Sequence, residues 1–382
     1  MKAFCLNNIS KVALNTLKAP DKTVDDVNAA DSILVRSAAM HDYELPKNVL
    51  AVARAGAGVN NIPLDKYAAE GVVVFNTPGA NANAVKELVI AGALLASRDI
   101  VGGIEWVKEN KADEAIAKTA EKAKAKFAGT EILGKTVSVV GLGVIGVLVA
   151  NAFVELGMKV KGYDPYLSIN NAMKLNKNVK YFEKLEDATA DADFITVHVP
   201  AMDATKKMIN KAVFDTLNDG AVVLNFSRDT LVNEDDLKEA LESGKVRKYV
   251  TDFANPNVVN FPNTIITPHL GASTEEAEDN CALMAINELK DFLENGNITN
   301  SVNYPSISLG VKQAQNRVCI NHKNIPGQIA HFTAVISDNG GNITDFVHKS
   351  RGDFAYSIID VDGNVDINQL QALDGVFRVR VI

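Results

Sequence analysis

The sequence predicts an α/β protein made of two doubly wound parallel-sheet domains, one inserted in the other, followed by a smaller α+β module. Three observations lead to this fold class. Short apolar runs alternate with helical patterns as far as about residue 304, as in parallel sheets covered by helices. A glycine-rich strand–helix–strand stretch occupies residues 136–165. From about residue 308 the order becomes strand–helix–strand–strand–helix–strand, which is typical of a ferredoxin-like module.

These patterns also predict the domain boundaries. A helical pattern at 83–97 is expected to lead into the inserted domain, and another at 274–293 to return the chain to the first one. Residues 108–126, rich in Lys, Ala and Glu, predict one solvated helix. The expected domains are a discontinuous substrate-binding domain of residues 1–93 and 281–304, an inserted Rossmann- or flavodoxin-like domain of residues 94–280, and a C-terminal module of residues 308–382.

Composition limits the classes of function. The 382 residues are 47% apolar and 23% charged, which is ordinary for a globular protein. A net charge of −8 argues against nucleic acid as a main partner. The cysteines (Cys5, Cys281, Cys319) are too widely spaced for a metal motif or a disulfide framework. Without a signal-peptide pattern or an apolar run of membrane length, we expect a cytoplasmic protein that touches no membrane.

The glycine-rich stretch carries the strongest functional signal. Gly141 allows a tight turn, Gly143 lets the backbone approach a pyrophosphate, and Gly146 lets the helix pack closely on the strand. The start of that helix offers unpaired N–H groups to phosphates. Asp164, 18 residues after Gly146, can accept hydrogen bonds from an adenosine ribose, and its charge would repel a 2′-phosphate. The stretch therefore predicts a dinucleotide site that prefers NAD to NADP.

Polar side chains also follow several other predicted strands. Arg36 and Arg54 follow two strands of the first domain, where they would suit a small anion. His269 and Arg228 follow strands after the glycine-rich stretch. Hydride transfer at a carbinol carbon needs a proton acceptor and a cation for a carboxylate, and these two residues could supply them. His198 is a second candidate for the proton acceptor.

Together these residues resemble the D-2-hydroxyacid dehydrogenase family over essentially the whole chain. Among the similar segments, RAGAGVNNI and TPHLGAST favour the branch of the family that oxidises phosphoglycerate. The segments are RS at 36–37, RAGAGVNNI at 54–62, NTPGANANAVKEL at 76–88, GKTVSVVGLGVIG at 134–146, YDP at 163–165, HVP at 198–200, NFSR at 225–228 and TPHLGAST at 267–274.

The resemblance implies oxidation of 3-phospho-D-glycerate to 3-phosphohydroxypyruvate by NAD, the first step of serine biosynthesis, in a homodimer or homotetramer. His269 would be the acid/base and Arg228 would bind the carboxylate. The implied substrate contacts are Arg36, Arg54, Gly58, Val59 and Asn81. The implied cofactor contacts are Gly141, Gly143, Val144, Ile145, Gly146, Asp164, His198, Val199, Pro200, Thr205, Phe226, Ser227, Asp252 and Gly271.

The C-terminal module resembles an ACT domain. Its segment HKNIPG at 322–327 is similar to the H-x-N-x-P-G loop with which ACT domains of serine-regulated relatives bind serine. His322 and Asn324 would then contact L-serine, and Asn342 would supply a facing amide. The same loop is also a plausible helix start with no ligand.

The sequence departs from the family in one segment. Relatives carry a glutamate near an Asp-x-Phe segment as partner of the catalytic histidine, but TDFANPN at 251–257 has none. Two further interpretations therefore stay open: a dehydrogenase for another D-2-hydroxy acid, and a non-catalytic protein that senses NAD and amino acids. The presence of both His269 and Arg228 favours an enzyme.

Overall fold

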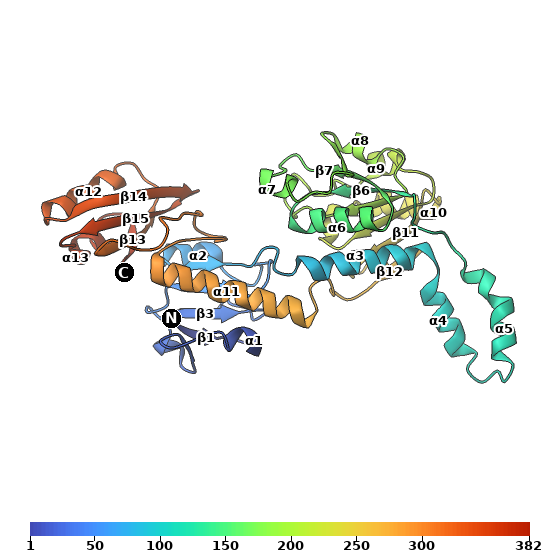
Figure 1. Cartoon of the computed structure of the whole chain (residues 1–382), viewed down its shortest axis with the longest axis horizontal. Helices are drawn as coiled ribbons and strands as arrows, with labels where there is room; N and C mark the ends of the chain where they lie inside the picture. The colour runs from blue at the N-terminus through green and yellow to red at the C-terminus, as the bar shows by residue number, and fades with distance from the viewer. The chain divides into compact units, whose positions relative to one another are not determined.

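A computed structural model describes all residues, 1–382, in two compact units (Figure 1). Unit 1 comprises Met1–Asn81 and Glu275–Ile382, and unit 2 comprises Ala82–Thr274. The boundaries lie at 81/82 and 274/275, whereas the sequence placed them at 93/94 and 280/281. The first shift arises because α3 (Ala82–Ser97) packs against α6 (Val144–Glu155), and a Cβ at Gly92 would lie 2.9 Å from the Phe226 ring.

Unit 2 is built on a parallel sheet of seven strands in the order β12-β11-β10-β9-β6-β7-β8. The strand order reverses between β6 and β9, which is the switch point where open parallel sheets bind ligands. The predicted doubly wound fold is confirmed, although the short edge strand β8 was missed. The strands are β6 (Thr136–Val140), β7 (Lys159–Tyr163), β8 (Lys180–Phe182), β9 (Phe194–Val197), β10 (Ala221–Asn225), β11 (Val246–Thr251) and β12 (Thr264–Ile266).

Helices and 3-10 turns cover both faces of this sheet. Besides α3 and α6 they are α7 (Ile169–Ala172), α8 (Leu185–Thr189), α9 (Lys211–Thr216), η3 (Asp229–Leu231), α10 (Glu234–Glu242) and η4 (Val258–Asn260). The apolar strands β6, β9 and β10 are buried along almost their entire length. Burial on both faces explains why these segments read as continuous apolar runs.

The helix predicted over 108–126 is wrong. The chain forms α4 (Ile100–Glu109), a turn, α5 (Ile116–Ala123) and η2 (Lys124–Phe127). Within the turn, the Asn110 side chain donates to the Trp106 carbonyl at 2.8 Å, and Asp113 Oδ1 accepts from the Ala115 N–H at 2.8 Å. Such short polar side chains bond to nearby backbone and so compete with the continuing helix.

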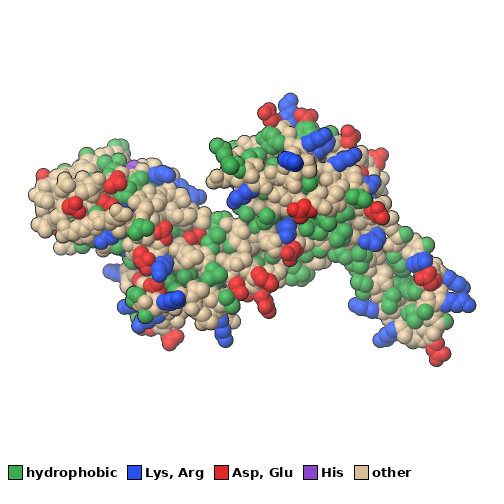
Figure 2. Space-filling model, in the orientation of Figure 1, with side chains coloured by type: hydrophobic (Ala, Val, Ile, Leu, Met, Phe, Trp, Pro, Cys, Tyr) green, Lys and Arg blue, Asp and Glu red, His purple; other side chains and the backbone are tan.

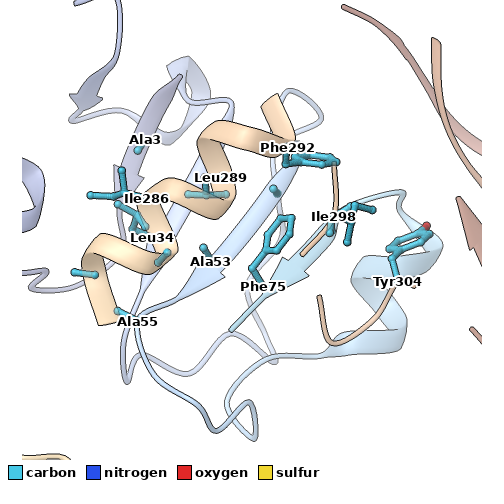
Figure 3. Close-up of a cluster of buried hydrophobic side chains, with 14 of the residues drawn as sticks. Ala3, Leu34, Ala53, Ala55, Phe75, Ile286, Leu289, Phe292, Ile298 and Tyr304 are labelled. Atoms are coloured by element: carbon cyan, nitrogen blue, oxygen red, sulfur yellow. The ribbon is translucent and has the colours of Figure 1, made fainter. Parts of the chain in front are cut away.

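Unit 1 contains a five-stranded parallel sheet in the order β2-β1-β3-β4-β5. Helix α11 (Glu275–Asn295) lies on it, and Figure 3 shows Ile286, Leu289 and Phe292 of α11 facing Phe75 and the other buried side chains of the sheet. The strands are β1 (Lys2–Cys5), β2 (Lys22–Val24), β3 (Ser32–Val35), β4 (Ala51–Arg54) and β5 (Val73–Phe75), with α1 (Lys11–Leu14), η1 (Val27–Ala29) and α2 (Leu64–Ala69) between them.

The C-terminal part of unit 1 is a four-stranded antiparallel sheet in the order β14-β15-β13-β16. This order confirms the predicted ferredoxin-like module. Phe332 and Ile336 of its first helix are fully buried against the sheet. The elements are β13 (Asn316–Lys323), α12 (Gln328–Asp338), β14 (Asn342–Arg351), β15 (Phe354–Asp362), α13 (Ile367–Gln371) and β16 (Val376–Val381).

Two arginines of β16 join this module to the rest of unit 1. Arg380 donates to the carbonyls of Phe292 and Leu293 at 2.6 and 3.1 Å, near the C-terminus of α11. Arg378 donates at 3.2 Å to the carbonyl of Glu70, the residue that ends α2. The last carbonyls of a helix have no partner within it and carry partial negative charge, so a cation there satisfies and stabilises them.

No helix combines the length and the apolarity that a membrane crossing requires. All three cysteines are unpaired, and two of them, Cys281 and Cys319, are buried.

Glu288 of α11 is an unusual buried group in unit 1. Its Oε1 accepts a hydrogen bond of 2.7 Å from Asn300, whereas Oε2 is buried with no partner in the protein. Burial raises the pKa of Glu288 from 4.5 to about 8 and outweighs the hydrogen bond, which acts in the opposite direction. The carboxyl is therefore mainly protonated at neutral pH.

This shift predicts a pH-dependent stability. The folded state holds the Glu288 proton more tightly than the unfolded chain, so its contribution is fully present below about pH 4.5 and is lost as the pH rises toward 8. The slope for one such group is at most about 1.4 kcal/mol per pH unit. Urea unfolding of Glu288→Gln should show a flatter dependence between these pH values, whereas exposed Glu276→Gln should follow the unmodified protein. Parallel curves for Glu288→Gln and the unmodified protein would contradict the assignment.

Candidate functional site

The glycine-rich loop between β6 and α6 is shaped by backbone contacts that exclude side chains. Gly141 has φ +93°, and a Cβ there would lie 2.6 Å from the carbonyl oxygen of His198. A Cβ at Gly146 would lie 1.8 Å from the carbonyl oxygen of Gly141. By contrast, a Cβ at Gly143, the N-cap of α6, would meet nothing within 4 Å. Gly141 and Gly146 are thus required by the fold, while Gly143 faces open space.

A carboxylate lies directly beside this loop. Asp164 follows β7, and its Oδ2 accepts a 2.8 Å hydrogen bond from the N–H of Leu142 within the loop. Its Oδ1 accepts from the N–H of Tyr166 at 2.8 Å. A bare helix N-terminus, beginning with Val144 and Ile145, and a fixed carboxylate at the end of the next strand are the groups that a dinucleotide requires. The residues present therefore fit the predicted cofactor.

His198 is not suited to acid/base chemistry. Its Nε2 lies 2.9 Å from the hydroxyl of Thr196, its Nδ1 is buried without a partner, and burial lowers its pKa to about 3. An imidazole with so low a pKa is a weak base, so His198 is a poor proton acceptor, and it carries no proton to donate as a general acid near neutral pH. Its neighbour Val199 packs against Gly141, so this strand end shapes the glycine loop.

The other expected cofactor contacts are held by local bonds. The hydroxyl of Thr205 donates to the carbonyl of Pro200 at 2.6 Å, and that of Ser227 donates to the carbonyl of Val197 at 2.6 Å. The ring of Phe226 is buried against α3 at Gly92. These bonds fix the loops that follow β9 and β10, at the carboxyl edge of the sheet.

His269 and Arg228 meet on one aromatic ring. His269 follows β12, and its imidazole centroid lies 4.7 Å from the ring centroid of Phe253. Arg228 follows β10, and its guanidinium carbon lies 5.7 Å from the same ring. Both polar side chains are exposed. The sequence analysis assigned His269 and Arg228 to one site, and in the structure both lie against the same ring. It did not predict the part played by Phe253.

Asp252, next to Phe253, is buried and bonded to the loop that carries His269. Its Oδ2 accepts from the N–H of Gly271 at 2.8 Å, while Oδ1 is buried without a partner. Burial raises the pKa of Asp252, and the N–H of Gly271 and the charge of His269 oppose that rise. Asp252 and Gly271 therefore belong to the same part of unit 2 as His269.

Segment 251–257 has no glutamate of its own, but a glutamate of helix α10 is hydrogen-bonded to it. Glu234, the first residue of α10, accepts hydrogen bonds from the side-chain amides of Asn255 at 2.8 Å and Asn257 at 2.7 Å. Each carboxylate oxygen serves one asparagine. This contact could not be predicted from the sequence, because 21 and 23 residues separate the partners.

In unit 1, Arg36, Arg54 and Gly58 lie together at the carboxyl ends of β3 and β4. Arg54 donates from Nε to the carbonyl of Arg36 at 2.8 Å and from Nη1 to the carbonyl of Gly58. Arg36 forms an ion pair of 2.5 Å with Glu278 of α11. Val59 lies in the same loop as Gly58, and Asn81 has a buried Oδ1 without a partner. Arg54 therefore braces the loop, a role that the sequence did not reveal.

The expected regulatory residues do not gather within one chain. His322 is fully buried, with Nδ1 2.7 Å from the carbonyl of Lys323 and Nε2 3.1 Å from the hydroxyl of Ser357. Burial lowers its pKa to about 4. Asn324 donates to the carbonyl of Gly352 at 3.0 Å. His322 pairs with Ala355 and Asn342 with Asp362, which puts them roughly 23 Å apart along β15.

The fold and these contacts define a dinucleotide-binding α/β protein with an imidazole and a guanidinium at the carboxyl edge of its larger sheet. Residues 90–271 match the family model for the D-isomer specific 2-hydroxyacid dehydrogenase, NAD binding domain. Through this domain the chain belongs to the D-isomer specific 2-hydroxyacid dehydrogenase family. The family description confirms the prediction of an NAD-binding domain.

Several relatives are D-3-phosphoglycerate dehydrogenases. The chain is 34% identical over 315 residues to that of Archaeoglobus fulgidus (80% of this chain, 57% of the relative) and 29% identical over 353 residues to that of Haemophilus influenzae (89% and 82%). It is 39% identical over 269 residues to that of Mycobacterium tuberculosis, covering 68% of this chain and 48% of the relative. The chain thus spans only about half the length of some of these relatives.

Solved structures are similar as well. The NAD+-bound 3-phosphoglycerate dehydrogenase of Entamoeba histolytica is 26% identical with a TM-score of 0.62, and covers 79% of this chain and 98% of its own. A D-2-hydroxyisocaproate dehydrogenase, 24% identical with a TM-score of 0.65 over 79% of this chain and 100% of its own, shares the fold.

The glycine loop offers a matched test of fold against binding. Gly146→Ala should unfold or strongly destabilise unit 2, because its methyl would overlap the Gly141 carbonyl. Gly143→Ala should fold normally yet bind NADH one to two orders of magnitude more weakly, as expected from overpacking costs of about 1–3 kcal/mol. Fluorescence titration and thermal melting measure the two effects, with Gly103→Ala in α4 as control. Unchanged NADH affinity in Gly143→Ala would remove this loop from the cofactor site.

Proposed function

We propose that this protein oxidises 3-phospho-D-glycerate to 3-phosphohydroxypyruvate with NAD, as the first step of serine biosynthesis. The observation that carries the proposal is the convergence of His269 and Arg228 on Phe253 in an NAD-binding domain of this family. The names of the curated relatives support the same substrate.

In this reaction NAD, when bound, accepts the hydride from the carbinol carbon. His269 takes the proton of the hydroxyl group, so the carbinol loses one hydride and one proton and becomes a ketone. Arg228 binds the carboxylate, which fixes the carbinol carbon relative to the imidazole. Asp252 keeps the His269 loop in place through the N–H of Gly271.

We assign the phosphate to Arg36 and Arg54. Arg36 is paired with Glu278, but both side chains are 42% exposed, and such surface pairs contribute only about 0–1 kcal/mol. A dianionic phosphate can displace that carboxylate. The same ion pair supports the second candidate, a dehydrogenase for another D-2-hydroxy acid, since Glu278 already neutralises Arg36. A sensor without catalysis is less well supported, because it has no use for an exposed His269 and Arg228.

The assignment predicts a substrate-specific defect. Arg36→Ala should lower kcat/KM for 3-phosphoglycerate by roughly 10- to 150-fold, since a hydrogen bond to a charged group contributes about 1.5–3 kcal/mol. Activity on unphosphorylated glycerate should hardly change, and Lys47→Ala, which removes an exposed charge elsewhere in unit 1, should match the unmodified protein. NADH formation measures both. Equal losses on the two substrates would refute the phosphate assignment, and no NADH with 3-phosphoglycerate, glycerate or D-lactate would refute the proposed activity.

We propose further that L-serine binds the ACT-like module and lowers activity. Because His322 and Asn342 are far apart within one chain, a serine site that uses both needs a second copy of the module. Ligand binding there could bias the conformational steps of the enzyme.

Calorimetry should therefore detect L-serine binding, and L-serine should lower the rate of NADH formation. Asn324→Ala and Asn342→Ala should each weaken both effects several-fold, while exposed Asn368→Ala should not. D-serine serves as the stereochemical control. Absence of heat and of inhibition at millimolar L-serine would leave the module with an architectural role.

A homo-oligomer, dimer or tetramer, is part of the proposal. Helix α4 has no buried residue and exposes Ile100, Val101, Ile104 and Val107. Figure 2 shows apolar and basic side chains side by side on the projection formed by α4 and α5. An exposed apolar stripe on a helix is typical of an interface. Light scattering should give the mass of a dimer or tetramer, and the mass of a monomer would contradict this part of the proposal. We expect the cytoplasm as the compartment, in keeping with three unpaired cysteines.

A further inference from the structure

We infer that Phe253 is the positioning residue for the acid/base and carboxylate-binding groups, and that Glu234 fixes Phe253 by clamping the segment that carries it. The inference rests on the proposed function, because it concerns how His269 and Arg228 are oriented for that reaction. Neither Phe253 nor Glu234 was singled out by the sequence.

The two exposed side chains have little support within the chain besides the Phe253 ring. The imidazole of His269 makes no hydrogen bond within the chain and lies against the Phe253 ring, with 4.7 Å between the ring centroids and an interplanar angle of 49°. The guanidinium of Arg228 has one hydrogen bond, to the neighbouring carbonyl of Ser227 at 2.6 Å. Its other contact is the same ring, in cation–π geometry.

The shared ring also limits the distance between the two groups. Because both groups lie against one ring, the imidazole and the guanidinium carbon are no more than about 10 Å apart, as the two contact distances of 4.7 and 5.7 Å require. A hydroxyl and the adjacent carboxylate of one small acid can therefore be held by both groups through ordinary hydrogen bonds. Displacing the ring would let both side chains rotate away from this spacing.

Phe253 is itself held by hydrogen bonds of the residues on both sides of it in the chain. Its N–H donates to the hydroxyl of Thr251 at 3.1 Å, and Asp252 before it accepts from Gly271. After it, Asn255 Oδ1 accepts from the backbone N–H groups of Asn257 at 3.1 Å and Val258 at 2.9 Å. These bonds make the segment a tight turn at the end of β11.

Glu234 completes this turn from outside. Its two oxygens accept from Asn255 and Asn257, so one carboxylate ties the turn to the first residue of α10. Hydrogen bonds to a charged group are about twice as strong as neutral ones, and a helix N-terminus favours the negative charge. Glu234 thus acts through the turn and not on the substrate.

The test compares a flat ring with an aliphatic side chain. Phe253→Leu should lower kcat for oxidation of 3-phosphoglycerate by roughly 10- to 100-fold, the size expected when a catalytic group is misplaced. Phe253→Tyr keeps the ring and should restore most of the rate. The melting temperature and the Kd for NADH should stay unchanged in both, because neither depends on the orientation of His269.

Glu234→Gln should lower kcat in the same direction but less, while Asp235→Asn, which removes a charge in the same helical turn without a described partner, should have no effect. Since Phe253 and Glu234 act as one unit, the double variant Phe253→Leu/Glu234→Gln should be no slower than Phe253→Leu. Losses that add, or losses of kcat that accompany equal losses of NADH affinity and melting temperature, would overturn the inference in favour of a merely structural role.

A readout independent of activity separates this inference from the proposed function. The chain has six histidines, so labelled imidazoles can be followed by NMR, with His269→Gln assigning the signal. The Phe253 ring should displace the His269 signal by its ring current, and Phe253→Leu should remove that displacement. A persistent displacement in an inactive protein would refute the proposed reaction alone. A His269 signal that ignores Phe253→Leu would refute the inference, whatever the activity.

Discussion

The structure of unit 2 depends on one close approach, between the carbonyl oxygen of Gly141 and the α-carbon of Gly146. A Cβ at Gly146 would come within 1.8 Å of that oxygen, so only glycine allows α6 to start where it does. This approach aims the N-terminus of α6 at the carboxyl edge of the sheet. It also lets Leu142 bond to Asp164 and brings Gly141 against the carbonyl of His198. The positions of the loops around this edge therefore depend on the close approach of Gly141 and Gly146.

The sequence predicted the features that follow from periodicity and composition. Buried parallel strands are continuous apolar runs, and the ferredoxin-like order of the C-terminal module follows from alternating patterns over 316–381. The short edge strands β2 and β8 were missed, because three residues at a sheet edge carry no apolar run. The break between α4 and α5 was also missed, since it depends on side chains of Asn110 and Asp113 that bond to the backbone.

For the candidate site, too, some features could be predicted from the sequence and others could not. Positions such as His269 and Arg228 could be proposed because polar groups at strand ends stand out in the sequence, and their roles stay predictions. The contacts that hold them could not be found, because a ring such as Phe253 is indistinguishable from an ordinary core residue until its neighbours are known. Likewise, the arginines of β16 that cap α11 and α2 resemble the alternating polar residues of any half-exposed strand. Long-range pairing of this kind has no local signature.

The groups with strongly shifted pKa values in this chain differ from the candidate catalytic residues. Strongly shifted pKa values often mark functional sites, yet here burial is the largest cause of the pKa shifts of His198, Glu288 and His322. Burial favours the uncharged form of each group, so the two imidazoles stay neutral near pH 7 and the Glu288 carboxyl is mainly protonated. His269 and Arg228 instead lie exposed, where water can reach the imidazole and a carboxylate can reach the guanidinium. Both side chains lie against the ring of Phe253, so in this protein the candidate site was recognised from geometry and not from shifted pKa values.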